Sequence, residues 1–208
     1  VLINGGDKVI VEAPTFVGTL NSLRFYQSDL IGIPVESDGM DTDKLEEVLK
    51  NNDVKLIYTI PTFQNPSGIT MSLAKRKKIL ELAEKYDVLI LEDNPYGDLR
   101  FAGNDIPTIK SMDEHDRVIY VGSFSKILSP GMRLGYVIAN EEIAGKIEVA
   151  KQANDVHTPL ITQMMATEFI KRYNIEEIIK KGRELYGKKC RFMLDCMDKY
   201  FPESVTYT

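Results

Sequence analysis

The feature that most constrains the fold is a regular alternation of short apolar segments with amphipathic ones along most of the chain. The apolar segments are rich in β-branched residues and almost uninterrupted by polar ones, which is typical of buried parallel strands. The strands expected on this basis are residues 8–13, 31–36, 54–60, 87–93, 117–123 and 134–139. The pattern predicts a three-layer α/β domain in which helices flank a mostly parallel sheet.

Helix-start signals lie between these segments. A helix is expected from Phe16 to about residue 26, a second after a cap at Asp41 or Thr42, and a third after Ser72. From residue 141 onward the pattern becomes helical. A long helix is expected to begin at the cap residue Asn174, with acidic residues in its first turn.

Composition excludes several classes of protein. The chain has 208 residues, enough for one substantial core, and a net charge of −5, which disfavours nucleic acid as a partner of this segment. Cys190 and Cys196 are too few for a zinc site or a disulfide framework, and they favour a reducing, cytoplasmic setting. The apolar runs are too short to span a bilayer, so no membrane partner is expected.

Unusual polar residues follow several of the predicted strands. The segments concerned are "PTFQNPSG" (61–68), "EDNPYGDLRF" (92–101) and "SFSKILSPGMRLG" (123–135), and a fourth, "VEAPTF", leads to an aromatic residue. Ligands of open α/β sheets gather at the carboxyl ends of strands. The candidate site residues are therefore Phe16, Asn65, Asp93, Tyr96, Ser123, Ser125, Lys126 and Arg133.

Singly, each of these residues has an ordinary explanation as a turn former, a helix cap or a surface charge. Together, the three motifs in this order resemble the signature of the fold-type I pyridoxal-phosphate enzymes, specifically the class I/II aminotransferases. The resemblance runs through essentially all 208 residues. It is greatest to the subgroup of 2-aminoadipate and aromatic aminotransferases, in which "YTIPTFQNPSG" has close counterparts.

The resemblance implies catalytic roles for three residues. Lys126 would form a Schiff base with the aldehyde of pyridoxal 5'-phosphate and then transfer a proton, acting as general base and acid. Partial burial and the neighbouring charge of Arg133 would favour the reactive neutral amine. Asp93 would keep the pyridine nitrogen protonated, and Tyr96 would hydrogen-bond the phenolic oxygen of the ring together with Asn65.

The remaining residues would hold the cofactor. Ser123 and Ser125 would donate hydroxyl hydrogen bonds to the phosphate, and Arg133 would add a charge-assisted and bidentate contact. Phe16 would stack on the face of the ring. The resemblance implies no metal.

The same resemblance implies a place in a larger protein. Residues 1–208 are expected to be a pyridoxal-phosphate-binding large domain of the aspartate-aminotransferase-like fold, truncated at both ends. The helix of about residues 174–208 would lead toward a missing small domain. The full-length protein is expected to be a cytoplasmic homodimer that acts on an amino acid and a 2-oxo acid, the identity of the amino acid being left open.

Two other functions use the same residues. A lyase or decarboxylase on this scaffold would need the same lysine and aspartate, and its products would include ammonia or carbon dioxide. Some bacterial transcription regulators attach an aminotransferase-like domain to a winged-helix domain and use it as an effector sensor. A basic winged-helix segment upstream of this chain would favour the regulator.

Overall fold

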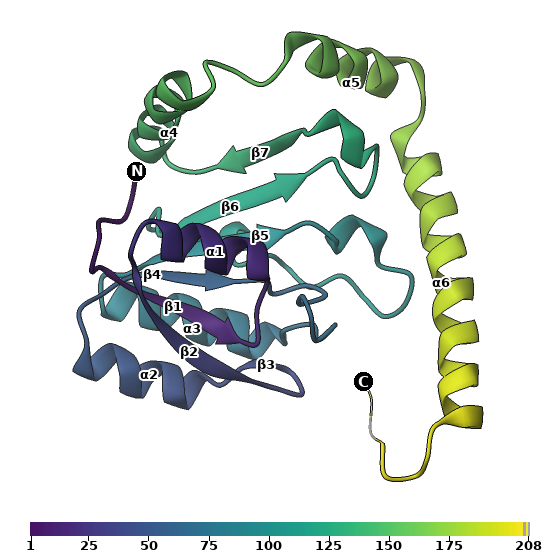
Figure 1. Ribbon diagram of the computed structural model, residues 1–208, viewed down its shortest axis with the longest axis horizontal. Coiled ribbons are helices and arrows are strands. Elements are labelled where there is room, and N and C mark those ends of the chain that lie inside the picture. The colour runs from purple at the N-terminus through teal and green to yellow at the C-terminus, as the bar shows by residue number, and fades with distance from the viewer. Residues whose placement is uncertain (206, 208) are drawn as a thin grey trace. The chain divides into compact units, whose positions relative to one another are not determined.

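In the computed structural model, which describes residues 1–205 and 207, the strands form one seven-stranded sheet in the order β3-β2-β1-β4-β5-β6-β7. Its strands are β1 (Lys8–Ala13), β2 (Asp29–Glu36), β3 (Gly39–Met40), β4 (Val54–Thr59), β5 (Leu89–Asn94), β6 (Val118–Ser123) and β7 (Gly135–Ile138). The β2-β1-β4-β5-β6 pairs are all parallel, and β3 is antiparallel to β2. Figure 1 shows β7 running opposite to β6. The mostly parallel sheet expected from the sequence is confirmed.

Most of the described helices follow a residue whose side chain accepts a hydrogen bond from the backbone of the first turn. The helices are α1 (Val17–Phe25), α2 (Thr42–Asn51), α3 (Leu73–Lys85), α4 (Glu141–Asn154), α5 (Leu160–Arg172) and α6 (Ile175–Tyr200). Asp41 accepts hydrogen bonds from the first turn of α2, at 3.0 and 2.9 Å, and Ser72 accepts one from Lys75 at 3.3 Å. Asn140 and Asn174 cap α4 and α6 in the same way. Each such cap contributes about 1 kcal/mol.

The chain folds into two units. The first contains residues 1–94, 106–122 and 136–156, and therefore nearly all of the sheet together with α1 to α4. The second contains residues 95–105 and 123–135, together with the described residues from His157 onward, which include α5 and α6.

Successive side chains of a strand point to opposite sides of the sheet, and in the first unit apolar side chains are buried on both of these faces. Ile10, Ile57 and Ile90 pack with α2 and α3 on one face. Val9, Val11, Leu56 and Tyr58 pack with Leu20 and Leu23 of α1 on the other. Helices on both faces of the sheet make the three layers that the alternating pattern predicted.

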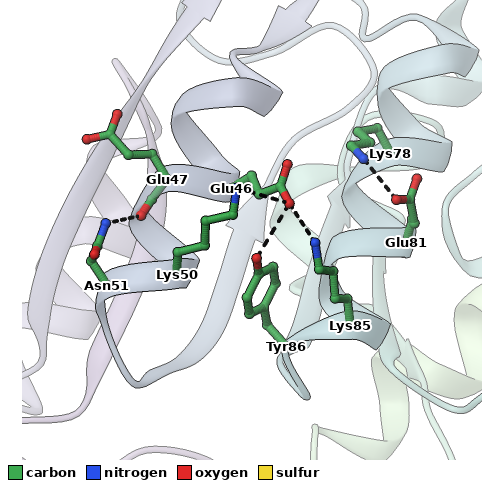
Figure 2. A network of polar contacts seen from close by, with 8 residues as sticks. All are labelled: Glu46, Glu47, Lys50, Asn51, Lys78, Glu81, Lys85 and Tyr86. Atoms are coloured by element: carbon green, nitrogen blue, oxygen red, sulfur yellow. Dashed lines mark hydrogen bonds and ion pairs between the residues drawn. The ribbon is translucent and has the colours of Figure 1, made fainter.

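Helices α2 and α3 are also joined by surface charges. Glu46 of α2 accepts a hydrogen bond from Lys85 at 2.7 Å, and the hydroxyl of Tyr86 lies 3.5 Å from the same carboxylate oxygen. Lys50 pairs with Glu46 from one turn further along α2, at 3.5 Å. Figure 2 shows these groups converging on Glu46.

Strand β7 differs from the other strands. It was expected to be a buried strand, but Tyr136, Val137 and Ile138 are 38%, 44% and 49% exposed. It is the last strand in the sheet order, so it has a neighbour on one side only among the described residues. The apolar run "LGYVIA" predicted the strand but could not distinguish an edge from a centre.

In the second unit, α6 packs on the segment after β5. The guanidinium of Arg183 donates to the carbonyl of Asp98 at 2.7 Å, and Gly187 lies against Phe101. The helix ends at Tyr200, next to Phe201 and Pro202, as a proline two residues on requires. Residues 206 and 208 of the expected 174–208 segment lie outside the described residues. None of the described helices is long and apolar enough to cross a bilayer.

Candidate active site

Asp93 lies at the carboxyl end of β5 in the first unit, beside a second carboxylate with a different task. Glu92 is 1% exposed and accepts hydrogen bonds from the backbone N–H groups of Ile109 and Lys110 at 2.9 and 2.8 Å. The pleat sends Asp93 to the opposite face, on which it accepts a hydrogen bond from the hydroxyl of Tyr58. Glu92 therefore anchors a loop, whereas Asp93 retains capacity to bind a ligand.

Burial raises the pKa of Asp93, and the hydrogen bond from Tyr58 opposes that rise in part. A nearby cation lowers the pKa of a buried carboxyl and favours its ionised form, because the attraction between the charges offsets the cost of desolvation. A protonated pyridine nitrogen is a cation of this kind. The surroundings of Asp93 thus fit the role that the sequence assigned to it.

Tyr58 and Thr19 were missed by the sequence reasoning. The hydroxyl of Tyr58 donates to Oδ2 of Asp93 at 2.9 Å, and Oγ1 of Thr19 donates to the Tyr58 oxygen at 3.0 Å. Tyr58 is 1% exposed and belongs to the apolar face covered by α1. In the sequence it reads as one more apolar residue of the segment "VKLIYTI", and only the register with β5 brings its hydroxyl to Asp93.

Phe16 immediately precedes α1 and is 40% exposed. Its ring lies over Gly18, so closely that a Cβ atom at that position would be 2.5 Å from the ring. An aromatic side chain that is both held in place and open to solvent fits a stacking role. Gly18 allows this arrangement because it has no side chain.

Asn65 lies on the loop after β4, which a buried network holds in place. Glu12, 2% exposed, accepts hydrogen bonds from Thr59 at 2.7 Å, from the backbone of Ile60 at 3.2 Å and from Gln64 at 3.1 Å. Gln64 also donates to the carbonyl of Pro14 at 2.8 Å. The network ties the end of β1 to the loop that carries Asn65.

Arg76 of α3 holds the same loop from another side. It is fully buried, and its guanidinium donates to the carbonyl of Pro61 at 2.8 Å and to the hydroxyl of Thr62 at 2.9 Å. Its guanidinium also donates to the carbonyls of Met71 and Pro107. In the sequence, the basic run "KRKK" at residues 75–78 reads as the solvated side of a helix. For Arg76 that interpretation is wrong, because its side chain is buried and its guanidinium donates to carbonyl groups of the loop.

Ser123, Ser125 and Lys126 lie in the second unit, at and just after the end of β6. The backbone N–H of Ser125 donates to Oγ of Ser123 at 3.1 Å, which tightens the turn. Nζ of Lys126 lies 5.8 Å from the centre of the Tyr96 ring, within the range of a cation–π contact. Lys126 is exposed, so the partial burial expected for it is not provided by the described residues of this chain.

Arg133 has an unusual backbone conformation. Its φ of 54° lies in the left-handed region, which non-glycine residues seldom adopt. Its guanidinium donates to the carbonyl of Pro130 at 3.4 Å. Strained residues of this kind are enriched at ligand sites.

The predicted site residues are divided between the two units. Phe16, Asn65 and Asp93 belong to the first unit, and the other five belong to the second. Within the second unit the structure brings Lys126 next to Tyr96, and the two serines next to each other. The roles assigned to the eight residues stay predictions.

A mostly parallel sheet with helices on both faces and polar residues after its strands is the arrangement of ligand-binding α/β domains. Residues 1–185 match the family model described as aminotransferase class I and II. The chain belongs to the class I and II aminotransferase family, and the family expected from the sequence motifs is confirmed.

Individual relatives agree with this assignment. The chain is 42% identical to aromatic-amino-acid aminotransferase 1 of Thermococcus litoralis over 100% of its own length and 51% of the relative's. It superimposes with a TM-score of 0.97 and 42% identity on Pyrococcus horikoshii kynurenine aminotransferase in complex with PMP, covering 100% of this chain and 52% of that one.

A third relative is LysN, the α-aminoadipate aminotransferase of Thermus thermophilus, complexed with N-(5'-phosphopyridoxyl)-L-leucine. It matches with a TM-score of 0.96 and 35% identity over 100% of this chain and 54% of that one. The chain therefore spans about half the length of the relatives it matches.

Proposed function

We propose that the protein containing this chain is a pyridoxal-phosphate-dependent aminotransferase that moves an amino group between an amino acid and a 2-oxo acid. Membership of the class I and II aminotransferase family and the names of the more similar relatives described above support transfer over lysis and over effector sensing. The observation that carries the proposal is the short segment of residues 123–135, which carries the amine of Lys126, the hydroxyls of Ser123 and Ser125 and the guanidinium of Arg133.

The donor set fits the chemical groups of the cofactor. A phosphate needs hydroxyl and guanidinium donors, which Ser123, Ser125 and Arg133 supply. An aldehyde needs a primary amine, which Lys126 supplies. When bound, pyridoxal phosphate provides a protonated ring that accepts the electron pair released at the substrate α-carbon.

The residues of this chain would then act as follows. Lys126 would hold the cofactor through its aldehyde group and would carry the proton that leaves the substrate α-carbon. Asp93 keeps the ring nitrogen protonated through its charge. Asn65 and Tyr96 would donate to the phenolic oxygen, and Phe16 would cover the ring face.

We further propose that the full-length protein is a homodimer in the reducing cytoplasm. The resemblance of the sequence motifs to the class I/II aminotransferases implies the homodimer. The free thiols of Cys190 and Cys196 agree with the reducing cytoplasm. Sedimentation of the full-length protein tests the oligomeric state, and a monomeric active enzyme would contradict it.

Reduction of the full-length protein with borohydride in the presence of saturating pyridoxal phosphate tests the function. We expect the peptide containing Lys126 to gain the mass of the reduced cofactor, and the Lys126→Ala variant to lose both this label and transamination. Lys110, which pairs with Asp113 at 2.8 Å, provides the control variant Lys110→Ala. An unlabelled Lys126 would refute the proposal.

The products separate the competing reactions. With a 2-oxo acid as acceptor, a new amino acid confirms transfer, whereas ammonia or carbon dioxide identifies a lyase or decarboxylase. A labelled protein that gives neither product with a wide screen of amino donors would identify an effector domain.

A further inference from the structure

A chain of two hydroxyl groups leads to Asp93 within the first unit. Thr19 of α1 donates from Oγ1 to the oxygen of Tyr58 at 3.0 Å, and Tyr58 of β4 donates to Oδ2 of Asp93 at 2.9 Å. Three separate elements therefore contribute one residue each to a single line of hydrogen bonds. The register of β4 and β5 places Tyr58 opposite Leu91, which lies two residues before Asp93 and on the same face.

The direction of both hydrogen bonds follows from the chemistry of the groups. An ionised carboxylate can only accept, so the single proton of the Tyr58 hydroxyl must point to Asp93. The Tyr58 oxygen is then left to accept, and the Thr19 hydroxyl supplies the proton. Burial and the charge of Asp93 raise the pKa of Tyr58, so this hydroxyl remains a donor throughout the neutral range.

The surroundings keep this line of hydrogen bonds fixed. Tyr58 is 1% exposed and packs among Val11, Leu56 and Ile60, so its ring cannot move aside. The hydroxyl therefore holds one carboxylate oxygen of Asp93 in one place, which also fixes the plane of the carboxylate. The second oxygen, Oδ1, has the capacity to accept a hydrogen bond from a ligand.

We propose that Thr19 and Tyr58 are positioning residues that orient Asp93 and hold it as a carboxylate for the ring nitrogen of the cofactor. This inference depends on the proposed function, because it assigns a purpose to a partner of Asp93. Neither residue contacts the reacting atoms. Both act through the carboxylate, Tyr58 directly and Thr19 by fixing the direction of the Tyr58 proton.

The Tyr58→Phe variant of the full-length protein removes the donor and keeps the ring. A hydrogen bond to a charged acceptor is lost, so we expect the affinity for pyridoxal phosphate to fall by roughly 10-fold or more. Because the Tyr58 hydroxyl lowers the pKa of Asp93, the variant should also show a higher pKa for this carboxyl in the cofactor-free protein. Carbon-13 NMR of labelled aspartate measures that pKa directly, and a purely structural role for Tyr58 would leave it unchanged.

The Thr19→Val variant is a milder second test, because it keeps Tyr58 and removes only the group that orients it. We expect changes of the same sign and smaller size. If Tyr58→Phe does not fold, as circular dichroism would show, this variant still decides the question. Wild-type cofactor affinity and a wild-type Asp93 pKa in Thr19→Val would then overturn the inference.

A matched control is available on the surface of the same unit. Tyr86→Phe makes the same change to a hydroxyl that lies 3.5 Å from a carboxylate oxygen of Glu46, between α2 and α3 (Figure 2). We expect this variant to bind the cofactor as the wild type does. An equal loss in Tyr86→Phe and Tyr58→Phe would show a general effect on stability and would overturn the inference.

A double-mutant cycle with Asp93→Asn tests whether Tyr58 acts through Asp93. If it does, adding Tyr58→Phe to Asp93→Asn should weaken cofactor binding by less than about twofold, although Tyr58→Phe alone weakens it much more. Additive losses would overturn the inference. Failure of the proposed function has a different signature, because Lys126 would then remain unlabelled by borohydride in the wild type.

Discussion

Two adjacent carboxylates at the end of β5 show how strongly the function of a residue depends on its neighbours. Both Glu92 and Asp93 have a pKa raised by burial. The backbone N–H groups of Ile109 and Lys110 donate to Glu92 and so tie their loop to β5, whereas Asp93 accepts a hydrogen bond from the hydroxyl of Tyr58. The hydrogen bonds of Glu92 give it a structural role, whereas Asp93 keeps the capacity to accept a further hydrogen bond from a ligand.

Arg133 allows a prediction at the scale of one side chain. Arg133→Lys keeps the positive charge and loses the planar fork that can contact a phosphate through two N–H groups. One charge-assisted hydrogen bond contributes about 1.5–3 kcal/mol, so we expect cofactor affinity to fall by roughly 10-fold or more. Fluorescence titration of the full-length protein with pyridoxal phosphate measures this change.

The control for this prediction is Arg172→Lys on α5. Arg172 pairs with Glu168 at 3.0 Å on an exposed helix surface, and the same substitution there should leave cofactor affinity unchanged. An Arg133→Lys variant that binds pyridoxal phosphate as tightly as the wild type would show that the guanidinium of Arg133 does not hold the phosphate.

At the scale of elements, the end of β1 and the loop after β4 act as one structure. Glu12 lies at the centre of this structure, and its oxygens accept from Thr59, Ile60 and Gln64. Burial is the largest influence on Glu12 and raises its pKa, although the three hydrogen bonds oppose the rise. The folded state therefore takes up a proton at Glu12 more readily than the unfolded chain does.

This shift predicts how stability depends on pH. Between the ordinary pKa near 4.5 and the raised value in the folded state, the folded protein binds more protons than the unfolded chain. The contribution of Glu12 to the free energy of unfolding should therefore fall as pH rises through this interval and become constant above it. In the Glu12→Gln variant this pH-dependent decrease in the free energy of unfolding should be absent. The altered hydrogen bonds of the variant change the free energy of unfolding by an amount that does not depend on pH.

Denaturant unfolding of the wild type and the variant at several pH values measures the difference. Glu142→Gln is a control with the opposite sign, because its ion pair with Lys146 lowers the pKa of Glu142. A wild-type curve parallel to that of Glu12→Gln across the interval would contradict the prediction.

The elements show what the sequence could predict. The strand at 8–13 and the caps at Asp41, Ser72 and Asn174 were predictable, because apolar period and capping chemistry are local properties. The hairpin strand β3 was not, since Gly39 and Met40 are too short to show a pattern.

The candidate site was predictable only in part. Motif residues such as Asp93 and Lys126 carry a family signature along the chain. Tyr58 and Thr19 carry none, because their purpose exists only after β4, β5 and α1 have come together. Glu12 did give a signal, a carboxylate at the end of an apolar strand, and this pattern is consistent with a buried acceptor.

At the scale of the whole molecule, the predicted site residues are divided between the two units. The second unit exposes many apolar side chains on α5, among them Ile161, Met164 and Met165 at 68%, 59% and 58%. Exposed apolar patches of this kind are usual at interaction surfaces. The chain spans about half the length of the relatives it matches.

The last prediction compares this chain alone with the full-length protein. Lys126 is exposed and Phe16 is 40% exposed, so water reaches the groups proposed to move the proton and cover the ring. Because exclusion of water and close placement of the substrate supply much of the catalytic effect, we expect kcat/KM for the chain alone to be lower by about 100-fold or more. Borohydride labelling of Lys126 in the isolated chain would show that it still binds the cofactor, and full-length Lys126→Ala sets the background rate. Equal rates for the two proteins would mean that these residues alone exclude water well enough for catalysis, which their exposure argues against.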